Sequence, residues 1–224
     1  MKILVADDDR ELSEILNFAL SRAGFEVVMA ANGEEALALF HAEQPALVLL
    51  DVSMPRLDGF EVCRRLRAQS AVPILMLTVR DTEEEVLRAF DLGADDYVTK
   101  PFSPKQLVAR IKAALRRGGG DAPAVLDAGP LRLDPERHEV SRPGAEAVRL
   151  TALEFRLLQV LVVNRGRVVP ADELVAQVWE CQRHVGDRAL LKGLVRRLRQ
   201  KLEADPAQPM WVQTVAGIGY TFGS

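Results

Sequence analysis

The chain has 224 residues, of which 48% are hydrophobic and 27% are charged, and its formal net charge is −3. This is the composition of a globular protein that is long enough to hold two hydrophobic cores. No apolar run approaches the roughly 20 residues that a membrane-spanning helix needs, and the first residues have no signal-peptide pattern. The two cysteines and three histidines are too scattered for a disulfide framework, a zinc site or a histidine-based catalytic site. We therefore expect a cytoplasmic protein without a membrane segment.

Four short apolar runs in the first half of the chain each lead into polar residues. The runs cover residues 2–6, 46–50, 73–77 and 96–99. They lead into Asp7 and Asp8, into Asp51, into Thr78 and into Lys100. Because the runs alternate with helical stretches, they predict parallel strands that are covered on both faces. Ligands of such sheets bind outside the carboxyl ends of the strands, so these side chains are expected to converge on one crevice.

The acidic members of this set predict a magnesium site. Mg²⁺ prefers a few carboxylates together with waters and phosphate oxygens. We interpret Asp8 as a direct ligand and Asp7 as a ligand that acts through water. Asp51 is expected to be both a ligand and a phosphoryl acceptor, because aspartate can form an aspartyl phosphate. The backbone carbonyl of Ser53 is the expected third ligand.

Thr78 and Lys100 complete the predicted site as donors to the remaining oxygens of a phosphoryl group. Taken alone, each of these residues is more simply a polar residue at the end of a strand, close to water. Five of them at matching strand ends favour a common site. The chemistry that this set predicts is phosphoryl transfer to Asp51 with the help of Mg²⁺.

The rest of the first half predicts the elements of a doubly wound α/β fold with a five-stranded parallel sheet. Helices with apolar residues at i, i+3, i+4 and i+7 are expected over Glu11–Ala23, Glu34–Ala42, Phe60–Ala68, Glu83–Leu92 and Pro104–Arg117. The remaining strand is expected over Phe25–Ala30. A triple glycine at 118–120, followed by Pro123, is typical of a flexible linker. The sequence thus predicts a first domain over 1–117, a linker over 118–123 and a second domain over 124–224.

The second half predicts an α+β domain of the winged-helix type. Short strands are expected over Val125–Ala128, Leu131–Leu133, Glu139–Ser141 and Ala147–Leu150. A helix is expected to begin with a capping box formed by Thr151 and Glu154 and to run to Asn164. Two further helices, over Ala171–Trp179 and Asp187–Glu203, precede a hairpin of Trp211–Val215 and Tyr220–Phe222. Three helices followed by a hairpin form a variant of the helix-turn-helix unit.

The third helix of this domain carries a basic stripe beside its apolar face. The stripe consists of Arg188, Lys192, Arg196 and Arg199. A basic stripe on an amphipathic helix is often only a solvated face. As the third helix of a winged-helix unit, however, it is in the position of a recognition helix, which enters the phosphate-lined major groove of DNA.

These motifs carry a family resemblance over nearly the whole chain. Residues 1–118 resemble a response-regulator receiver domain through Ala6-Asp7-Asp8, Asp51-x-x-Met54-Pro55-x-x-Asp58-Gly59, Thr78, Gly93-Ala94-Asp95-Asp96-Tyr97 and Lys100-Pro101-Phe102. The second half, with Arg196–Leu202 and Thr214-Val215-x-Gly217-Ile218-Gly219-Tyr220, is similar to the effector domain of OmpR/PhoB-type two-component response regulators. The resemblance implies a flavodoxin-like receiver fold and a transcription regulator that receives its phosphoryl group on Asp51 from a sensor histidine kinase. It also implies binding to double-stranded DNA at direct-repeat half-sites, with RNA polymerase as a candidate partner.

The resemblance implies three further features. The Lys100-Pro101 bond is expected to be cis, and Tyr97 is expected to act with Thr78 as a switch, whereas the sequence alone also allows an exposed strand tyrosine at 97. The phosphorylated form is expected to be a homodimer, with Asp95, Asp96, Arg110 and Arg117 at its interface. Another family charge pair is matched here by the neutral residues Val86 and Gln106.

Two departures from the family pattern stand out. Ala216 lies in the predicted wing where many relatives have an arginine, and Val79 follows Thr78 where a small residue is usual. Two other functions remain open from sequence. The chain could be an aspartyl-phosphate hydrolase, or a regulator that binds DNA without phosphorylation. We expect a phosphorylation-controlled regulator and not an enzyme with a separate substrate.

Overall fold

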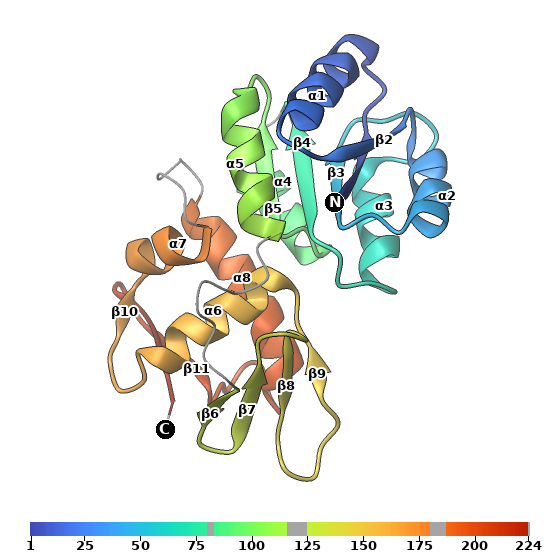
Figure 1. Cartoon of the computed structure of the whole chain (residues 1–224). Helices are drawn as coiled ribbons and strands as arrows, with labels where there is room; N and C mark the ends of the chain where they lie inside the picture. The colour runs from blue at the N-terminus through green and yellow to red at the C-terminus, as the bar shows by residue number, and fades with distance from the viewer. Residues whose placement is uncertain (80–82, 116–124, 180–186, 224) are drawn as a thin grey trace. The chain divides into compact units, whose positions relative to one another are not determined.

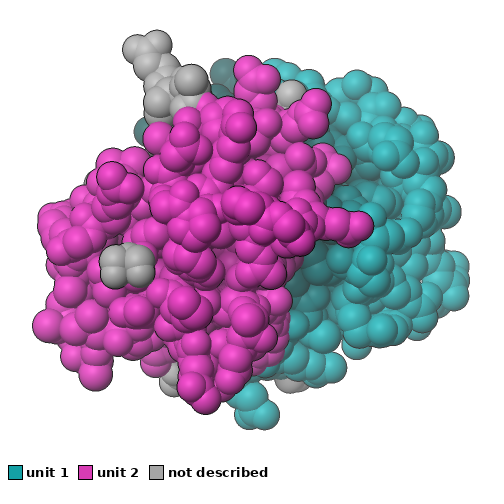
Figure 2. Space-filling model, turned by 90° about the horizontal axis from the view of Figure 1, so that it is seen from below, with its two compact units in different colours: residues 1–115 teal, residues 116–224 magenta. Residues whose placement is uncertain are grey.

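The structure is a computed structural model that describes residues 1–79, 83–115, 125–179 and 187–223 (Figure 1). The chain divides into two compact units, residues 1–115 and 116–224, which are coloured separately in Figure 2. The predicted linker, 118–123, lies outside the described residues, so the predicted domain boundaries remain a prediction. Each unit is described by itself.

The first unit contains a five-stranded parallel sheet in the order β2-β1-β3-β4-β5. Its strands are β1 (Lys2–Ala6), β2 (Glu26–Ala30), β3 (Leu47–Asp51), β4 (Ile74–Thr78) and β5 (Asp96–Thr99). Its helices are α1 (Arg10–Arg22), α2 (Gly33–Glu43), α3 (Gly59–Arg67), α4 (Glu83–Asp91) and α5 (Pro104–Leu115). The predicted doubly wound α/β fold is confirmed, with described element ends within two residues of those expected.

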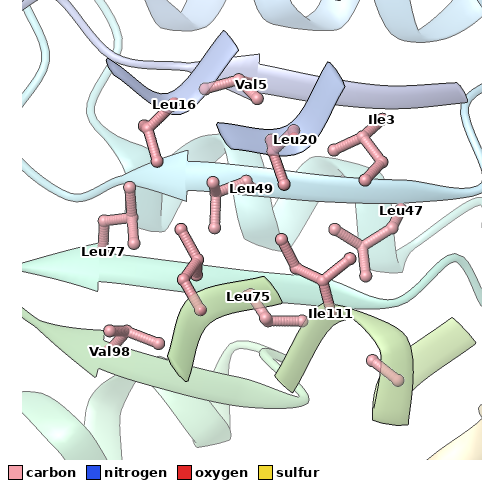
Figure 3. Close-up of a cluster of buried hydrophobic side chains, with 12 residues drawn as sticks. Ile3, Val5, Leu16, Leu20, Leu47, Leu49, Leu75, Leu77, Val98 and Ile111 are labelled. Atoms are coloured by element: carbon pink, nitrogen blue, oxygen red, sulfur yellow. The ribbon is translucent and has the colours of Figure 1, made fainter. Parts of the chain in front are cut away.

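The apolar runs of the sequence become strands that are buried on both faces. Every residue of β1, β3 and β4 is buried except Lys2, which is half-buried. One face of the sheet packs against α1 and α5 in a cluster that includes Leu16, Leu20 and Ile111 (Figure 3). Since full burial of each aliphatic side chain contributes about 1.5–3 kcal/mol, this core fixes the strand order and hence the position of the strand ends.

The second unit begins with a four-stranded antiparallel sheet of β6 (Leu126–Ala128), β7 (Leu131–Asp134), β8 (Glu139–Ser141) and β9 (Val148–Arg149). Three helices follow, α6 (Ala152–Val163), α7 (Ala171–Trp179) and α8 (Asp187–Leu202). The chain then forms the hairpin of β11 (Val212–Val215) and β12 (Gly219–Phe222). The winged-helix architecture predicted from the sequence is confirmed.

One element of this unit was not predicted. Strand β10 (Val169–Pro170) pairs with β12, so the terminal hairpin belongs to a three-stranded sheet in the order β10-β12-β11. Two residues, one of them a proline, carry no strand pattern of their own, because proline cannot donate to a ladder and is confined to sheet edges. Only the pairing with a distant strand makes them a strand.

Candidate acidic site and candidate nucleic-acid interface

Three carboxylates meet at the carboxyl ends of the central strand, β3, and its neighbour β1. Asp7 follows β1 and Asp51 ends β3, and these strands are neighbours in the sheet. Asp7, Asp8 and Asp51 offer oxygens that lie within 4.8 Å of one another. Asp7 and Asp51 are 3% and 5% exposed, whereas Asp8 is open to solvent. Oxygen donors at this spacing, two of them buried and one in contact with water, fit a hard divalent cation such as Mg²⁺.

The backbone holds two of these acids in place. Asp7 accepts a hydrogen bond of 3.0 Å from the N–H of Asp9, and Asp51 accepts one of 3.2 Å from the N–H of Ser53. Ser53 itself is exposed beside the cluster. That its carbonyl oxygen is a metal ligand remains a prediction. The loop after β3 returns so closely that a Cβ on Gly59 would lie 2.0 Å from the carbonyl oxygen of Asp51, so only glycine fits there.

Lys100 joins the cluster from the end of β5. Its Nζ atom lies 2.8 Å from Oδ2 of Asp7 and 2.8 Å from Oδ1 of Asp51. Its backbone N–H donates to the carbonyl oxygen of Thr78 at 2.6 Å, and the Lys100-Pro101 bond is cis, as the resemblance implied. The structure thus brings Asp7, Asp51 and Lys100 into direct contact.

Burial and ion pairing oppose each other in this site. Burial raises the pKa of the Asp51 carboxyl, the Lys100 ammonium lowers it, and the net shift is upward. For Lys100, burial lowers the pKa, but hydrogen bonds to Asp51 and Asp7 outweigh it and the net shift is again upward. The lysine therefore stays charged and supplies the positive charge that holds two buried carboxylates together.

Thr78 and Tyr97 lie on the neighbouring strands β4 and β5, and their side chains line the same cavity. Thr78 ends β4 and is 7% exposed, and Tyr97 in β5 is 9% exposed. Both line a small cavity of about 10 Å³ together with Val52 after β3, Met76 of β4 and side chains from α3 and α4. The Tyr97 ring packs edge-on against Phe90, with 6.0 Å between centroids. The alternative of an exposed strand tyrosine is therefore wrong, while the switch role of Tyr97 stays a prediction.

The residues assigned to a dimer interface have partners within the unit. Asp96 receives two hydrogen bonds of 2.8 Å from Nη1 of Arg110, and both side chains are buried. Asp95 is 1% exposed and lies 2.7 Å from Nη2 of Arg67. Arg117 lies outside the described residues. The part of these four residues in a dimer remains a prediction. Within the single chain, Asp95 and Asp96 have a structural role.

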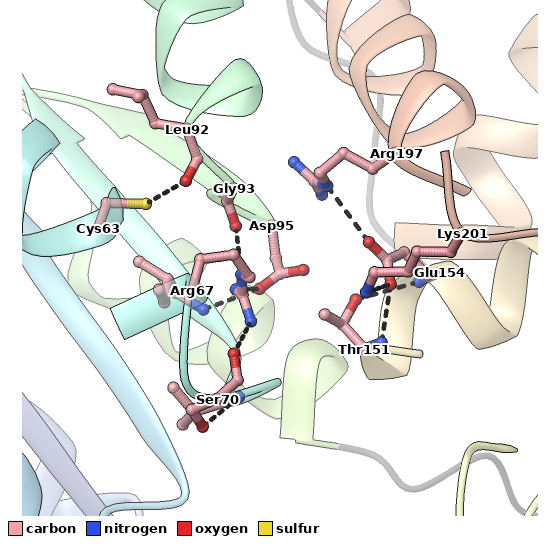
Figure 4. A network of polar contacts seen from close by, with 12 residues as sticks. Cys63, Arg67, Ser70, Leu92, Gly93, Asp95, Thr151, Glu154, Arg197 and Lys201 are labelled. Carbon is pink, nitrogen blue, oxygen red and sulfur yellow. Dashed lines mark hydrogen bonds and ion pairs between the residues drawn. The ribbon is translucent and has the colours of Figure 1, made fainter. Parts of the chain in front are cut away.

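Arg67 is a residue that sequence reasoning missed. Besides Asp95, it donates to the carbonyl oxygens of Gly93 at 2.9 Å and Ser70 at 3.0 Å (Figure 4). It thereby ties the end of α3 to the turn before β5. No sequence signal predicts this, because the ion pair joins residues 28 positions apart.

In the second unit, the predicted basic stripe lies on α8, but its members have different surroundings. Lys192 and Arg196 are exposed. Arg188 pairs with Asp172 of α7 at 3.2 Å, which raises its pKa. Arg199 is half-buried and donates to the carbonyl oxygen of Val212 at 2.8 Å. The stripe is therefore a surface of two exposed cations, flanked by two arginines that contact other elements.

A second polar network joins α6 to α8, and only part of it was predicted from the sequence (Figure 4). The predicted capping box is confirmed: Thr151 and Glu154 exchange hydrogen bonds of 2.9 and 3.3 Å. Glu154 is 0% exposed and also lies 2.6 Å from Lys201 and 3.4 Å from Arg197. Burial raises the pKa of Glu154, but these two cations outweigh it, so the net shift is downward. Two of the basic residues in the Arg196–Leu202 run thus serve the interior of the unit.

Comparison with known families agrees with this division of the chain. The profile of the family described as "Response regulator receiver domain" matches residues 3–112. The profile described as "Transcriptional regulatory protein, C terminal" matches residues 144–222. Among the described residues, no helix is long and apolar enough to cross a membrane.

Similar proteins match over nearly their whole length. The sensory transduction protein RegX3 of Mycobacterium bovis is 45% identical, with 97% of each chain covered. The DNA-binding response regulator MtrA of Mycolicibacterium smegmatis is 44% identical, over 99% of this chain and 96% of its own. Among solved structures, DrrB of Thermotoga maritima, an OmpR/PhoB homologue, has a TM-score of 0.53 at 33% identity, covering 100% of this chain and 99% of its own. A RitR mutant has a TM-score of 0.73 at 28% identity, with 99% and 98% covered.

Proposed function

This chain belongs to the OmpR/PhoB-type family of two-component response regulators, and we propose that phosphorylation of Asp51 in its first unit controls DNA binding by its second. A receiver domain implies a histidine kinase as partner, and the C-terminal domain implies DNA. The family is one of regulators and not a classical enzyme family. The observation that carries the proposal is the contact of Lys100 with both Asp7 and Asp51 at the strand ends.

Asp51 is the acceptor in this proposal. A carboxylate oxygen of Asp51 attacks the phosphorus of a phosphohistidine on the kinase, the P–N bond breaks, and the imidazole leaves with its electron pair. Mg²⁺ held by Asp7, Asp8, Asp51 and the carbonyl of Ser53 would neutralise charge on the transferred group. Asp51 is the proposed acceptor because its strand, β3, lies between β1, which leads into Asp7, and β4, which ends in Thr78, and because the ammonium of Lys100 lies 2.8 Å from its carboxylate.

Lys100 and Thr78 then respond to the new charge. The ammonium of Lys100 exchanges its carboxylate partners for a phosphoryl oxygen, and the hydroxyl of Thr78 turns toward another. Because Thr78 and Tyr97 line one cavity, a change at Thr78 alters the space that the Tyr97 ring can occupy. The phosphorylated form then pairs as a homodimer through the surface of α4, β5 and α5.

The second unit supplies the DNA contact. Helix α8 enters the major groove and presents Lys192 and Arg196 to the phosphates and base edges. Two copies in a dimer would read two direct-repeat half-sites about one helical turn apart, and RNA polymerase is a candidate partner of the bound protein. We place this regulator in the cytoplasm, where a kinase and DNA are both accessible.

DNA affinity measured with and without a phosphoryl analogue tests this proposal. A duplex is selected from a random pool with the beryllofluoride-treated protein, and its affinity is then compared for treated and untreated protein. We expect the treated protein to bind about tenfold tighter, which corresponds to ~1.4 kcal/mol of coupling. Asp51→Asn, the matched control, should show no difference. Equal affinity of treated and untreated parent would identify instead a regulator that binds DNA without phosphorylation.

A further inference from the structure

Two side chains, Arg199 in the last turn of α8 and Glu203 directly after it, join the end of this helix to the start of the terminal hairpin. The carboxylate of Glu203 accepts hydrogen bonds of 2.9 Å from each backbone N–H of residues 210–212. One turn earlier, Arg199 donates from Nε to the carbonyl oxygen of Val212 at 2.8 Å and from Nη2 to Oγ1 of Thr214 at 2.7 Å. We call Arg199 and Glu203, with these bonds, the α8–β11 clamp.

The clamp fixes the direction of β11 as well as its position. Val212 and Thr214 lie two residues apart on one strand, and the guanidinium of Arg199 bonds to both of them. A single anchor would allow the strand to pivot, whereas two anchors define a line. Because β11 pairs with β12 from Val212 to Val215, the direction of β11 also sets where the hairpin tip lies.

The hairpin carries no charged side chain that would attract it to DNA. Residues 212–223 contain no Asp, Glu, Lys or Arg, and the tip presents Ala216 and Ile218, the latter 56% exposed. Attraction to DNA phosphates comes from Lys and Arg, so no electrostatic force draws this tip toward the duplex. Its place beside the DNA must therefore come from contacts within the unit: β10 pairs with its second strand, and the clamp connects its first strand to α8.

We propose that Arg199 is a positioning residue for DNA recognition, which holds the uncharged hairpin at a set distance from the exposed cations Lys192 and Arg196. Lys192, Arg196 and Arg199 follow one another at i, i+4 and i+7 on one face of α8. The first two are presented to the duplex, and the third sets the wing beside them. The inference rests on the DNA binding proposed above and assigns Arg199 a role other than phosphate contact.

The salt dependence of DNA affinity distinguishes an arginine that contacts phosphate from one that positions the hairpin. The full chain, treated with beryllofluoride, is titrated with the selected duplex at several salt concentrations, as parent, Arg199→Ala and Arg196→Ala. Loss of a phosphate contact flattens the slope of log affinity against log salt by about 0.9, which is expected for Arg196→Ala. For Arg199→Ala we expect affinity to fall about tenfold while the slope matches the parent. A slope flattened by about 0.9, or an unchanged affinity, overturns the proposal.

Thr214→Val provides a second test that does not depend on the folding of Arg199→Ala. It removes one bond of the clamp and no charge. We expect a loss of about threefold at an unchanged slope, and no further loss when it is combined with Arg199→Ala, because both act through one contact. Full additivity of the two variants, or parental affinity for Thr214→Val alone, contradicts the clamp. If the parent itself fails to bind any duplex, the proposed DNA-binding function fails with it, which is a different result from a parent that binds and variants that match it.

Discussion

Nζ of Lys100 and Oδ1 of Asp51 lie 2.8 Å apart, and the same ammonium lies 2.8 Å from Asp7. The ammonium of Lys100 therefore contacts the same carboxylate oxygens that would bind a divalent cation. Two positive charges at this distance repel each other, so metal and lysine compete for the same oxygens.

We predict that Lys100→Met binds Mg²⁺ about tenfold tighter than the parent, because it removes a competing positive charge from beside the acids. Isothermal titration calorimetry of the full chain measures this directly. Lys100→Arg, which keeps the charge, serves as the control and should stay near the parental affinity. Weaker Mg²⁺ binding by Lys100→Met would mean that the lysine organises the acids for the cation and does not compete with it.

Asp51 is predicted to be the sole phosphoryl acceptor. Incubation with acetyl phosphate and Mg²⁺ should add the mass of one phosphoryl group, and Asp51→Asn or EDTA should abolish the gain. Labelling that persists in Asp51→Asn would place the acceptor elsewhere.

Val79, which follows Thr78, is predicted to slow phosphoryl exchange at Asp51. Its side chain is 65% exposed, whereas Thr78 is 7% exposed, so it is the solvent-facing residue next to the site. Val79→Ala should speed labelling by acetyl phosphate about threefold and shorten the lifetime of the phosphorylated form, as measured by mass spectrometry over time. Val79→Thr keeps the branched shape and should behave as the parent does, since steric access is the stated cause. If Val79→Ala is both labelled and dephosphorylated at the parental rates, the steric account is wrong.

The buried ion cluster around Glu154 is predicted to make the second unit sensitive to acid. Folding lowers the pKa of Glu154, so the folded state binds its proton less readily than the unfolded state. The stabilisation is thus fully present above the ordinary glutamate pKa of about 4.3 and is lost as pH falls below it toward the folded-state value. Both tryptophans of the chain, Trp179 and Trp211, lie in this unit, so their fluorescence reports its unfolding alone.

Glu154→Gln is the variant that tests this. We expect a loss of about 3 kcal/mol in the free energy of unfolding at neutral pH, since Arg197 and Lys201 lose a buried partner. We also expect a weaker dependence of stability on pH in the acid range. Glu173→Gln is a matched control in the same unit, where Glu173 pairs with Arg167 at the surface, and it should leave the acid profile unchanged. A parental acid profile for Glu154→Gln would assign the acid sensitivity to other carboxylates.

Much of the acidic site was predictable because it depends on local pattern and one topological rule. Apolar runs that end in Asp7, Asp51, Thr78 and Lys100 define parallel strands, and parallel strands place their carboxyl ends together. The capping box of Thr151 and Glu154 was predictable for the same reason, since its partners are three residues apart. The third strand of the wing sheet was not, because Val169–Pro170 has no strand pattern without β12.

The sequence by itself determined the elements, the convergence of acids and lysine, and the face of α8 on which the basic residues lie, because these follow from periods of two or 3.6 residues and from strand direction. Only the tertiary structure decided what each basic residue does there. Arg188 and Arg199 contact α7 and β11, while Lys192 and Arg196 are exposed to solvent. Helical periodicity specifies a face, but the partner of a side chain on that face depends on which distant element packs beside it. For Arg199 that element is a strand 13 residues further along the chain, placed there by the folding of the whole unit.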